Sequence, residues 1–166
     1  MGAAVDRFAH LSLALLIYAL LSRELGLELH RAPAALLRGP HVMLPYLAAP
    51  ALCLIGARLP DAMDRGRGPG HRGAGHSLLA LGVCSSMAWW IGGLVSPELA
   101  RVSALFLGAG QLSHLLLDWI TYEGVPWLWP AGRKSSLRIC KAGGLLIGLI
   151  GLLSLVLALR LLLLPT

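Results

Sequence analysis

The sequence predicts an all-α, polytopic integral membrane protein that forms a single domain over residues 1–166. Of these residues, 57% are hydrophobic and only 13% are charged, and the mean hydropathy is +0.73. An ordinary soluble domain has about 25% charged residues. Five apolar runs approach the roughly 20 residues that a helix needs to cross a bilayer. They cover residues 8–25, 42–59, 77–95, 99–120 and 142–164.

Each run has its own features. The first resembles the core of a signal peptide, but no small-x-small cleavage site follows it, so we expect it to remain in the mature protein. The second contains Pro45 and Pro50, which kink a helix but are tolerated where neighbouring helices satisfy the freed backbone groups. A short loop at 96–98 separates the third run from the fourth. The last run carries Gly144, Gly148 and Gly151, which suit close helix packing.

Composition also restricts the classes of partner and metal site. Cys53, Cys84 and Cys140 show no close pairing, so neither a disulfide framework nor a thiolate zinc site is expected. Any metal would need His and carboxylate ligands. The net charge of +6 comes from Arg and Lys residues between the apolar runs, without interleaved aromatic residues. We therefore expect the lipid bilayer, and no nucleic acid, as a partner.

Five crossings would place the N-terminus and the loops at 58–76 and 121–141 on one side of the membrane. These segments contain more Arg and Lys than the segments on the other side. Because positively charged residues are retained in the cytoplasm, we expect this face to be the cytoplasmic face of the cell inner (plasma) membrane.

Residues that can ligate a metal gather at the same face. His114 and Asp118 are four residues apart, so they share one face of a helix, and leucines surround them. Ionisable groups inside an apolar span are costly and usually point to a partner or a site. The full candidate set is His10, Asp61, Asp64, His71, His76, His114 and Asp118.

Imidazole nitrogen and carboxylate oxygen are the ligands that zinc prefers, and manganese also accepts them. The set predicts one or two divalent ions, and two adjacent ions would suit displacement at phosphorus. Arg72, between two histidines, could orient a phosphate. Taken singly, a His near a helix end is more often a hydrogen-bonded residue, and the pair in "HLLLD" is equally compatible with a buried hydrogen bond. The metal hypothesis depends on several segments delivering His or Asp to one face.

Three sequence motifs resemble those of a known protein family. "RLPDAMD", "GHRGAGHSLL" and "LSHLLLDWITYEGVPWLWP", in this order and after an early His10, resemble the YdjM-like family of inner-membrane metal-dependent hydrolases. The resemblance covers most of residues 8–130. Its His-x-x-x-Asp element is also similar to that of zinc-dependent phospholipases C, which favours phosphoester chemistry.

The resemblance implies roles for individual residues and shows two departures. It implies metal or active-site roles for Asp61, His71, His76, His114 and Asp118, with His10 as a further ligand and Thr121 in support. The second aspartate of the first motif would fall at Met63, whereas this chain has Asp64 one place later. Gly75 stands where the family has threonine, which removes a hydroxyl beside the second histidine.

We therefore expect a membrane-embedded hydrolase that cleaves a phosphoester, preferably lipid-linked, with a metal-activated water. Asp64 and Arg72 would be catalytic, and His10, Asp61, His71, His76, His114 and Asp118 would bind metal. Two alternatives are a non-catalytic metal-binding membrane protein and a metal-ion transporter. Transport needs polar ligands near the bilayer midplane, where the spans offer little beyond Gln111, Ser85, Ser86 and Ser103.

Overall fold

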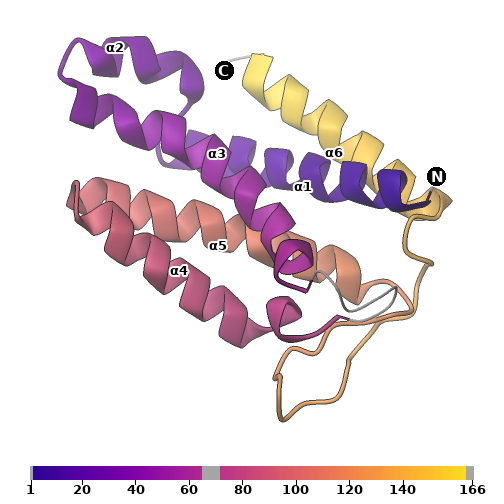
Figure 1. Cartoon of the computed structure of the whole chain (residues 1–166). Helices are drawn as coiled ribbons and strands as arrows, with labels where there is room; N and C mark the ends of the chain where they lie inside the picture. The colour runs from indigo at the N-terminus through magenta and orange to yellow at the C-terminus, as the bar shows by residue number, and fades with distance from the viewer. Residues whose placement is uncertain (1, 65–71, 164–166) are drawn as a thin grey trace.

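The computed structural model describes residues 2–64 and 72–163, and most of these residues are helical (Figure 1). The long helices are α1 (Gly2–Glu24), α3 (Pro40–Met63), α4 (Leu78–Gly93), α5 (Pro97–Trp119) and α6 (Leu145–Leu163). The short ones are η1 (Leu29–Arg31), α2 (Ala32–Leu36) and η2 (Ala74–His76). Over the described ranges, β structure is limited to two isolated bridges, Thr121 with Cys140 and Val125 with Ser135. The predicted all-α class is confirmed.

The five predicted apolar runs all form helices, four of them long enough to span a membrane and one shorter. Helices α1, α3, α5 and α6 are long and apolar enough to cross a membrane. The run at 77–95 forms α4, an apolar helix of 16 residues, which is shorter than the roughly 20 needed. The run loses residues at both ends. Ser77 is the N-cap, whose hydroxyl accepts a hydrogen bond from the Ala80 N–H at 3.1 Å, and Leu94 is the C-cap.

Local sequence explains where the other helices begin. Ser96 caps α5 by accepting from the Leu99 N–H at 3.0 Å, and Pro97 occupies the first turn, where no intrahelical N–H partner is lost. Helix α3 likewise begins with a proline and continues through Pro45 and Pro50. The expectation that these two prolines lie inside one apolar helix is confirmed.

Glycines bring α3 and α5 into direct backbone contact. A Cβ atom added at Gly110 of α5 would overlap the carbonyl oxygen of Cys53, and one added at Gly56 of α3 would overlap that of Leu107. Small residues allow membrane helices to approach in this way, because packing takes the place of hydrophobic driving force in lipid. The adjoining core is formed by Ala14, Tyr18, Ala49, Cys53, Ala57, Val102 and Phe106.

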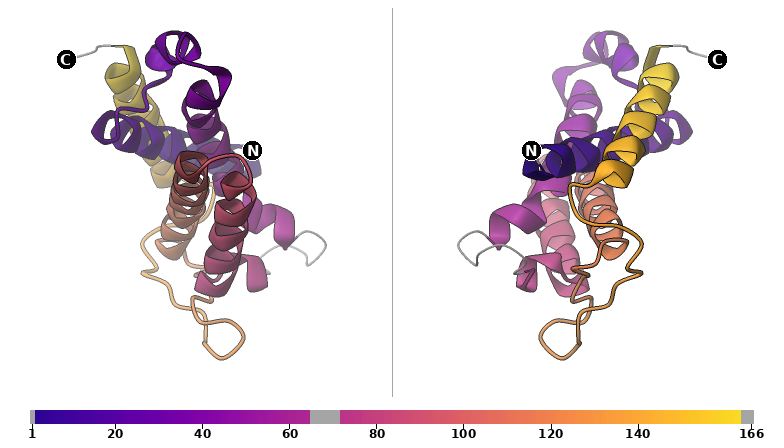
Figure 2. Two further views of the ribbon diagram at one scale, coloured as in Figure 1. Left: turned by 90° about the vertical axis from the view of Figure 1, so that its left-hand side faces the viewer. Right: turned by 90° about the vertical axis from the view of Figure 1, so that its right-hand side faces the viewer.

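The helix arrangement brings four distant segments to one end of the molecule. Helix α6 packs on α1, and α4 packs on α5 (Figure 2). The C-terminal ends of α3 and α5, the N-terminal part of α1 and the start of α4 lie together, and the loop between α5 and α6 extends from the same end (Figures 1 and 2). These are the segments that the sidedness prediction placed at one membrane face.

Replacing Gly110 by alanine should therefore destabilise the α3–α5 contact. Overpacking costs about 1–3 kcal/mol, and here the obstructing atoms are backbone. We expect Gly110→Ala to lower the midpoint of thermal unfolding in detergent. Gly82→Ala is the matched control, since a Cβ atom at this exposed helical position meets nothing within 4 Å. Equal midpoints for the two variants would contradict the contact.

Candidate metal centre

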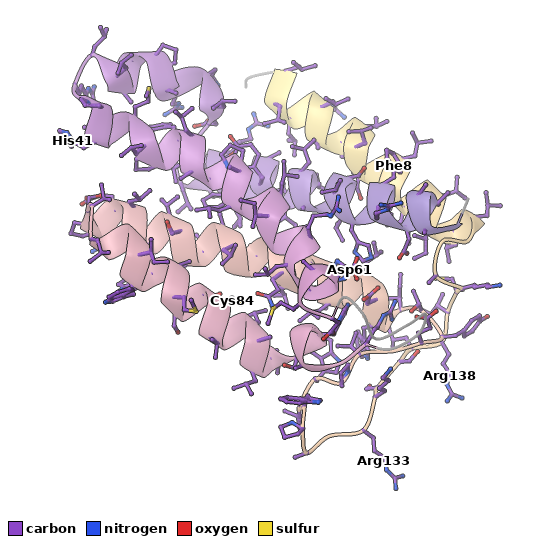
Figure 3. The ribbon with its side chains drawn as sticks, viewed as in Figure 1. Phe8, His41, Asp61, Cys84, Arg133 and Arg138 are labelled. Carbon is purple, nitrogen blue, oxygen red and sulfur yellow. The ribbon has the colours of Figure 1, made fainter. Side chains whose placement is uncertain are left out.

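The last turns of α5 contribute two buried donors. His114 and Asp118 are 1% and 2% exposed, and the Nε2 atom of His114 lies 3.3 Å from the Oδ2 atom of Asp118. Their spacing of one helical turn places both side chains on one face of α5, as the sequence predicted. The face points toward the end of α3, where Asp61 lies (Figure 3).

Two further donors come from α3 and η2. Asp61, in the last turn of α3, places its Oδ1 atom 3.6 Å from Nε2 of His114. His76, at the end of η2, places its Nε2 atom 3.5 Å from Asp61 Oδ1, 3.3 Å from Asp118 Oδ2 and 3.3 Å from His114 Nε2. Residues from three separate segments thus direct two nitrogens and two oxygens toward a common centre.

Five of the six distances among these four donors match the spacing expected around one tetrahedral cation. Zinc binds His nitrogen and carboxylate oxygen at about 2.0–2.2 Å, so donors at tetrahedral angles lie roughly 3.3–3.6 Å apart. The five donor-to-donor distances above run from 3.3 to 3.6 Å. His76, His114 and Asp61 also form a group whose donor atoms all lie within 4.8 Å of one another. The donor set and its geometry therefore fit a divalent metal ion.

Hydrogen bonds fix both histidines with Nε2 directed to the centre. The Nδ1–H of His114 donates to the carbonyl oxygen of Ala57 at 2.7 Å. The Nδ1 atom of His76 lies 2.7 Å from Oδ2 of Asp64, which also accepts from the N–H of Gly73 at 2.8 Å. A carbonyl or carboxylate on Nδ1 is the usual outer partner of a metal-bound histidine, because it sets the tautomer and the ring orientation.

Arg72 supports the second oxygen of Asp118, and Thr121 accepts a hydrogen bond from Arg72. The Arg72 guanidinium donates to Oδ1 of Asp118 at 2.6 Å, to the hydroxyl of Thr121 at 3.0 Å and to the carbonyl oxygens of Asp118 and Gly124 at 3.1 Å. Its side chain is 9% exposed. The structure thus places Arg72 behind the cluster, where it balances the charge of a buried carboxylate.

His10 lies beside the four donors. Its ring stacks on that of His114 with centroids 3.9 Å apart, and its Nε2 atom lies 3.4 Å from Oδ1 of Asp118. These three residues form a second group that could hold an ion. However, His114 belongs to both groups, and only its Nε2 atom is available. Because the two groups share this atom, the described residues of the cluster favour a single ion.

The charges of the cluster shift the pKa values of its two members outside the spans. Burial would lower the pKa of His76, but hydrogen bonds with Asp118, Asp61 and Asp64 outweigh it and raise the pKa to about 9. Burial would likewise raise the pKa of Asp64, but hydrogen bonds from His76, Gly73 and Gly75 lower it. Without a metal, His76 therefore holds a proton at neutral pH.

The structure shows what Asp64 and Gly75 do at the two positions that depart from the family motif. Asp64 is the C-cap of α3, and it binds His76 from there, whereas Met63 is 48% exposed. A Cβ atom at Gly75 would lie 2.7 Å from the carbonyl oxygen of Pro60. Glycine thus allows η2 to sit against the end of α3, which brings His76 to the centre.

Most of the candidate residues meet in space. His10, Asp61, Asp64, Arg72, His76, His114 and Asp118 lie in one cluster, and His71 lies outside the described residues. Sequence reasoning missed the Ala57 carbonyl, which carries no side-chain signal. Arg58 was not among the candidate residues either, although it lies three residues before Asp61 and so shares its face of α3.

The fold and the cluster define a polytopic membrane protein with a buried His/Asp centre that could bind a metal ion. A family model described as YdjM inner membrane protein matches residues 5–164, and the chain belongs to this family. No curated protein and no solved structure matches the chain.

Removing one donor should abolish tight metal binding. We expect His114→Ala and Asp118→Asn to lose at least about a hundredfold in zinc affinity, because each removes a ligand and leaves buried groups unpaired. Zinc content by elemental analysis and a chelator competition titration measure the effect. His41→Ala is the control, since His41 is exposed at the opposite end of α3 (Figure 3). Equal zinc content in all the variants would contradict the proposed centre.

Zinc affinity should also depend on pH. Below about 9, a zinc ion must displace the proton that His76 holds in the metal-free protein. The apparent affinity should therefore tighten as the pH rises from 6 to 8, by about tenfold per pH unit for each proton displaced. Calorimetry in buffers of different ionisation enthalpy measures the released protons directly. An affinity that is constant over this range, with no proton release, would be the opposite result.

Proposed function

We propose that this protein is a metal-dependent hydrolase that cleaves a phosphoester of a membrane lipid. The observation that carries the proposal is a four-donor His/Asp centre at the end of membrane-spanning helices, with one of its four donors exposed. A bound zinc ion would supply Lewis-acid chemistry, polarising a phosphoryl oxygen and making water nucleophilic at neutral pH.

The exposure of Asp61 supports a catalytic role for the metal centre. His76, His114 and Asp118 are buried, whereas the side chain of Asp61 is 53% exposed. Catalytic zinc sites use three protein ligands and keep a fourth position for water or substrate. We assign the three buried residues to the permanent ligand set and Asp61 to the exchangeable position, where solvent and substrate have access.

The remaining residues of the cluster would hold these ligands in place. Asp64 fixes the ring of His76 through Nδ1, and Arg72 binds the Asp118 oxygen that faces away from the centre. Hydrolysis transfers the hydroxyl of water to phosphorus and the proton to the departing alcohol oxygen. Asp64 and Arg72 would contribute by positioning the ligands for that step, and Thr121 by holding Arg72.

The position of the centre favours a lipid substrate. It lies at the end of α3 and α5, two helices long and apolar enough to cross a bilayer, and therefore near the depth of lipid head groups. A lipid phosphoester reaches such a centre by diffusing within the bilayer. The basic residues of the same loops favour the cytoplasmic face.

A second candidate function is a structural metal site. Structural zinc sites are closed, with four protein ligands, and the described residues do supply four donors. Such an ion would join α3, η2 and α5. It would stabilise the fold without turnover.

Hydrolysis of bis-p-nitrophenyl phosphate by the purified protein separates the two functions. For a hydrolase, a strong chelator should abolish product formation, zinc or manganese should restore it, and Asp118→Asn should reduce the rate by at least about a hundredfold together with the zinc content. Glu98→Gln, at the other end of α5, should leave the rate unchanged. A zinc-loaded protein without turnover, whose thermal midpoint falls on chelation, would establish the structural site instead.

A further inference from the structure

A groove beside the metal centre opens between α1 and α3. Its volume is about 380 Å³, near the lower end of the roughly 300–1000 Å³ of small-molecule pockets. Both helices are long and apolar enough to cross a membrane, so the groove faces the lipid bilayer. It is lined by Leu11, Leu54, Ile55, Arg58, Leu59, Asp61 and Ala62.

The lining changes in a fixed order along α3. Asp61, the exposed donor of the centre, lies at the helix end, Arg58 lies about one turn deeper and Ile55 about one turn deeper again. A lipid phosphoester has a matching order: a phosphate, whose oxygens can bind both a metal ion and an arginine, followed by a hydrocarbon chain. The groove is therefore complementary to an amphiphile that enters head first from the bilayer.

Arg58 is suited to the phosphate position. Over the parts of the chain that the structure describes, its guanidinium makes no hydrogen bond and no ion pair, although it lies inside an apolar helix. A charged side chain in such a segment is costly unless it serves a site or reaches the interface. The planar guanidinium can bind a phosphate through two parallel hydrogen bonds, which a lysine cannot do.

We propose that the groove of Leu11, Leu54, Ile55 and Leu59 holds one hydrocarbon chain of the substrate while Arg58 binds its phosphate beside Asp61. This inference rests on the proposed function and defines its substrate class as a long-chain phosphoester taken up laterally from the membrane. The small volume accommodates one chain, and any second chain stays in the bilayer.

A larger cavity, of different lining, does not offer this arrangement. It measures about 1030 Å³ and is lined by residues such as Tyr18, Arg23 and Leu161, near the opposite ends of α1 and α6. No residue of the metal cluster lines it. A phosphate bound there would lie far from the four donors.

Photo-crosslinking in nanodiscs of phosphatidylcholine tests the proposal. The probe is a long-chain alkylphosphonate with a diazirine in the chain, whose C–P bond resists hydrolysis, and the reference is the alcohol with the same chain. On the zinc-loaded wild type, we expect the phosphonate to label residues 54–62 about tenfold more than the alcohol does, because only the phosphonate can form charge-assisted hydrogen bonds with Arg58. Mass spectrometry of the digested protein locates the label.

Paired variants separate the head-group contact from the chain contact. Arg58→Ala should reduce the labelling by the phosphonate several-fold, whereas Arg160→Ala, at an exposed arginine of α6, should not. Ile55→Trp should fill the groove and reduce the labelling by both compounds. Leu47→Trp, a substitution at another exposed apolar position of α3, should not.

The outcomes also distinguish this inference from the proposed function. Equal labelling of 54–62 by the two compounds, comparable labelling of the exposed face of α6, or no effect of Arg58→Ala would overturn the inference, even if bis-p-nitrophenyl phosphate is hydrolysed. Selective labelling that depends on Arg58, in a protein that hydrolyses no phosphoester, would support the lipid site and reject the hydrolase.

Discussion

The buried carboxylate of Asp118 is the group on which the rest of the site depends. Its Oδ1 atom binds Arg72 at 2.6 Å and lies 3.4 Å from His10, while its Oδ2 atom lies 3.3 Å from both His76 and His114. A carboxylate that is 2% exposed is tolerated only with partners of opposite charge or hydrogen-bond donors. The partners come from α1, α5 and the segment before α4, so one carboxylate joins the separate helices at this end of the molecule.

Close helix packing makes this arrangement possible. Gly56 and Gly110 let α3 and α5 approach until their backbones touch, and the same approach brings the Ala57 carbonyl to the Nδ1 atom of His114. Gly75 has a similar effect where η2 meets α3. A rigid set of donors needs supports of this kind, because ligand spacing must hold to within a fraction of an ångström for a metal to bind well. The spacing of the donors therefore depends on the close packing that the glycines allow.

The metal centre and the groove adjoin each other through a shared residue. Asp61 belongs to both, as the exposed member of the donor set and as the end of the groove. His76, His114 and Asp118 are buried among the helices, whereas Asp61 and Arg58 are exposed. In our proposal, buried ligands provide affinity for the ion, and the exposed edge provides access for a lipid.

The sequence by itself determined the all-α class, the membrane location and the gathering of His10, Asp61, His76, His114 and Asp118 at one end, because apolar run length and helix direction depend on local composition. It also predicted that His114 and Asp118 share a face, since helical periodicity fixes this. Only the tertiary structure decided that Asp64 binds the Nδ1 atom of His76, that Arg72 binds the carboxylate of Asp118, and that α4 is shorter than a full span. These properties depend on distances between segments that are remote in the chain, and on caps at helix ends, which residue spacing alone does not encode.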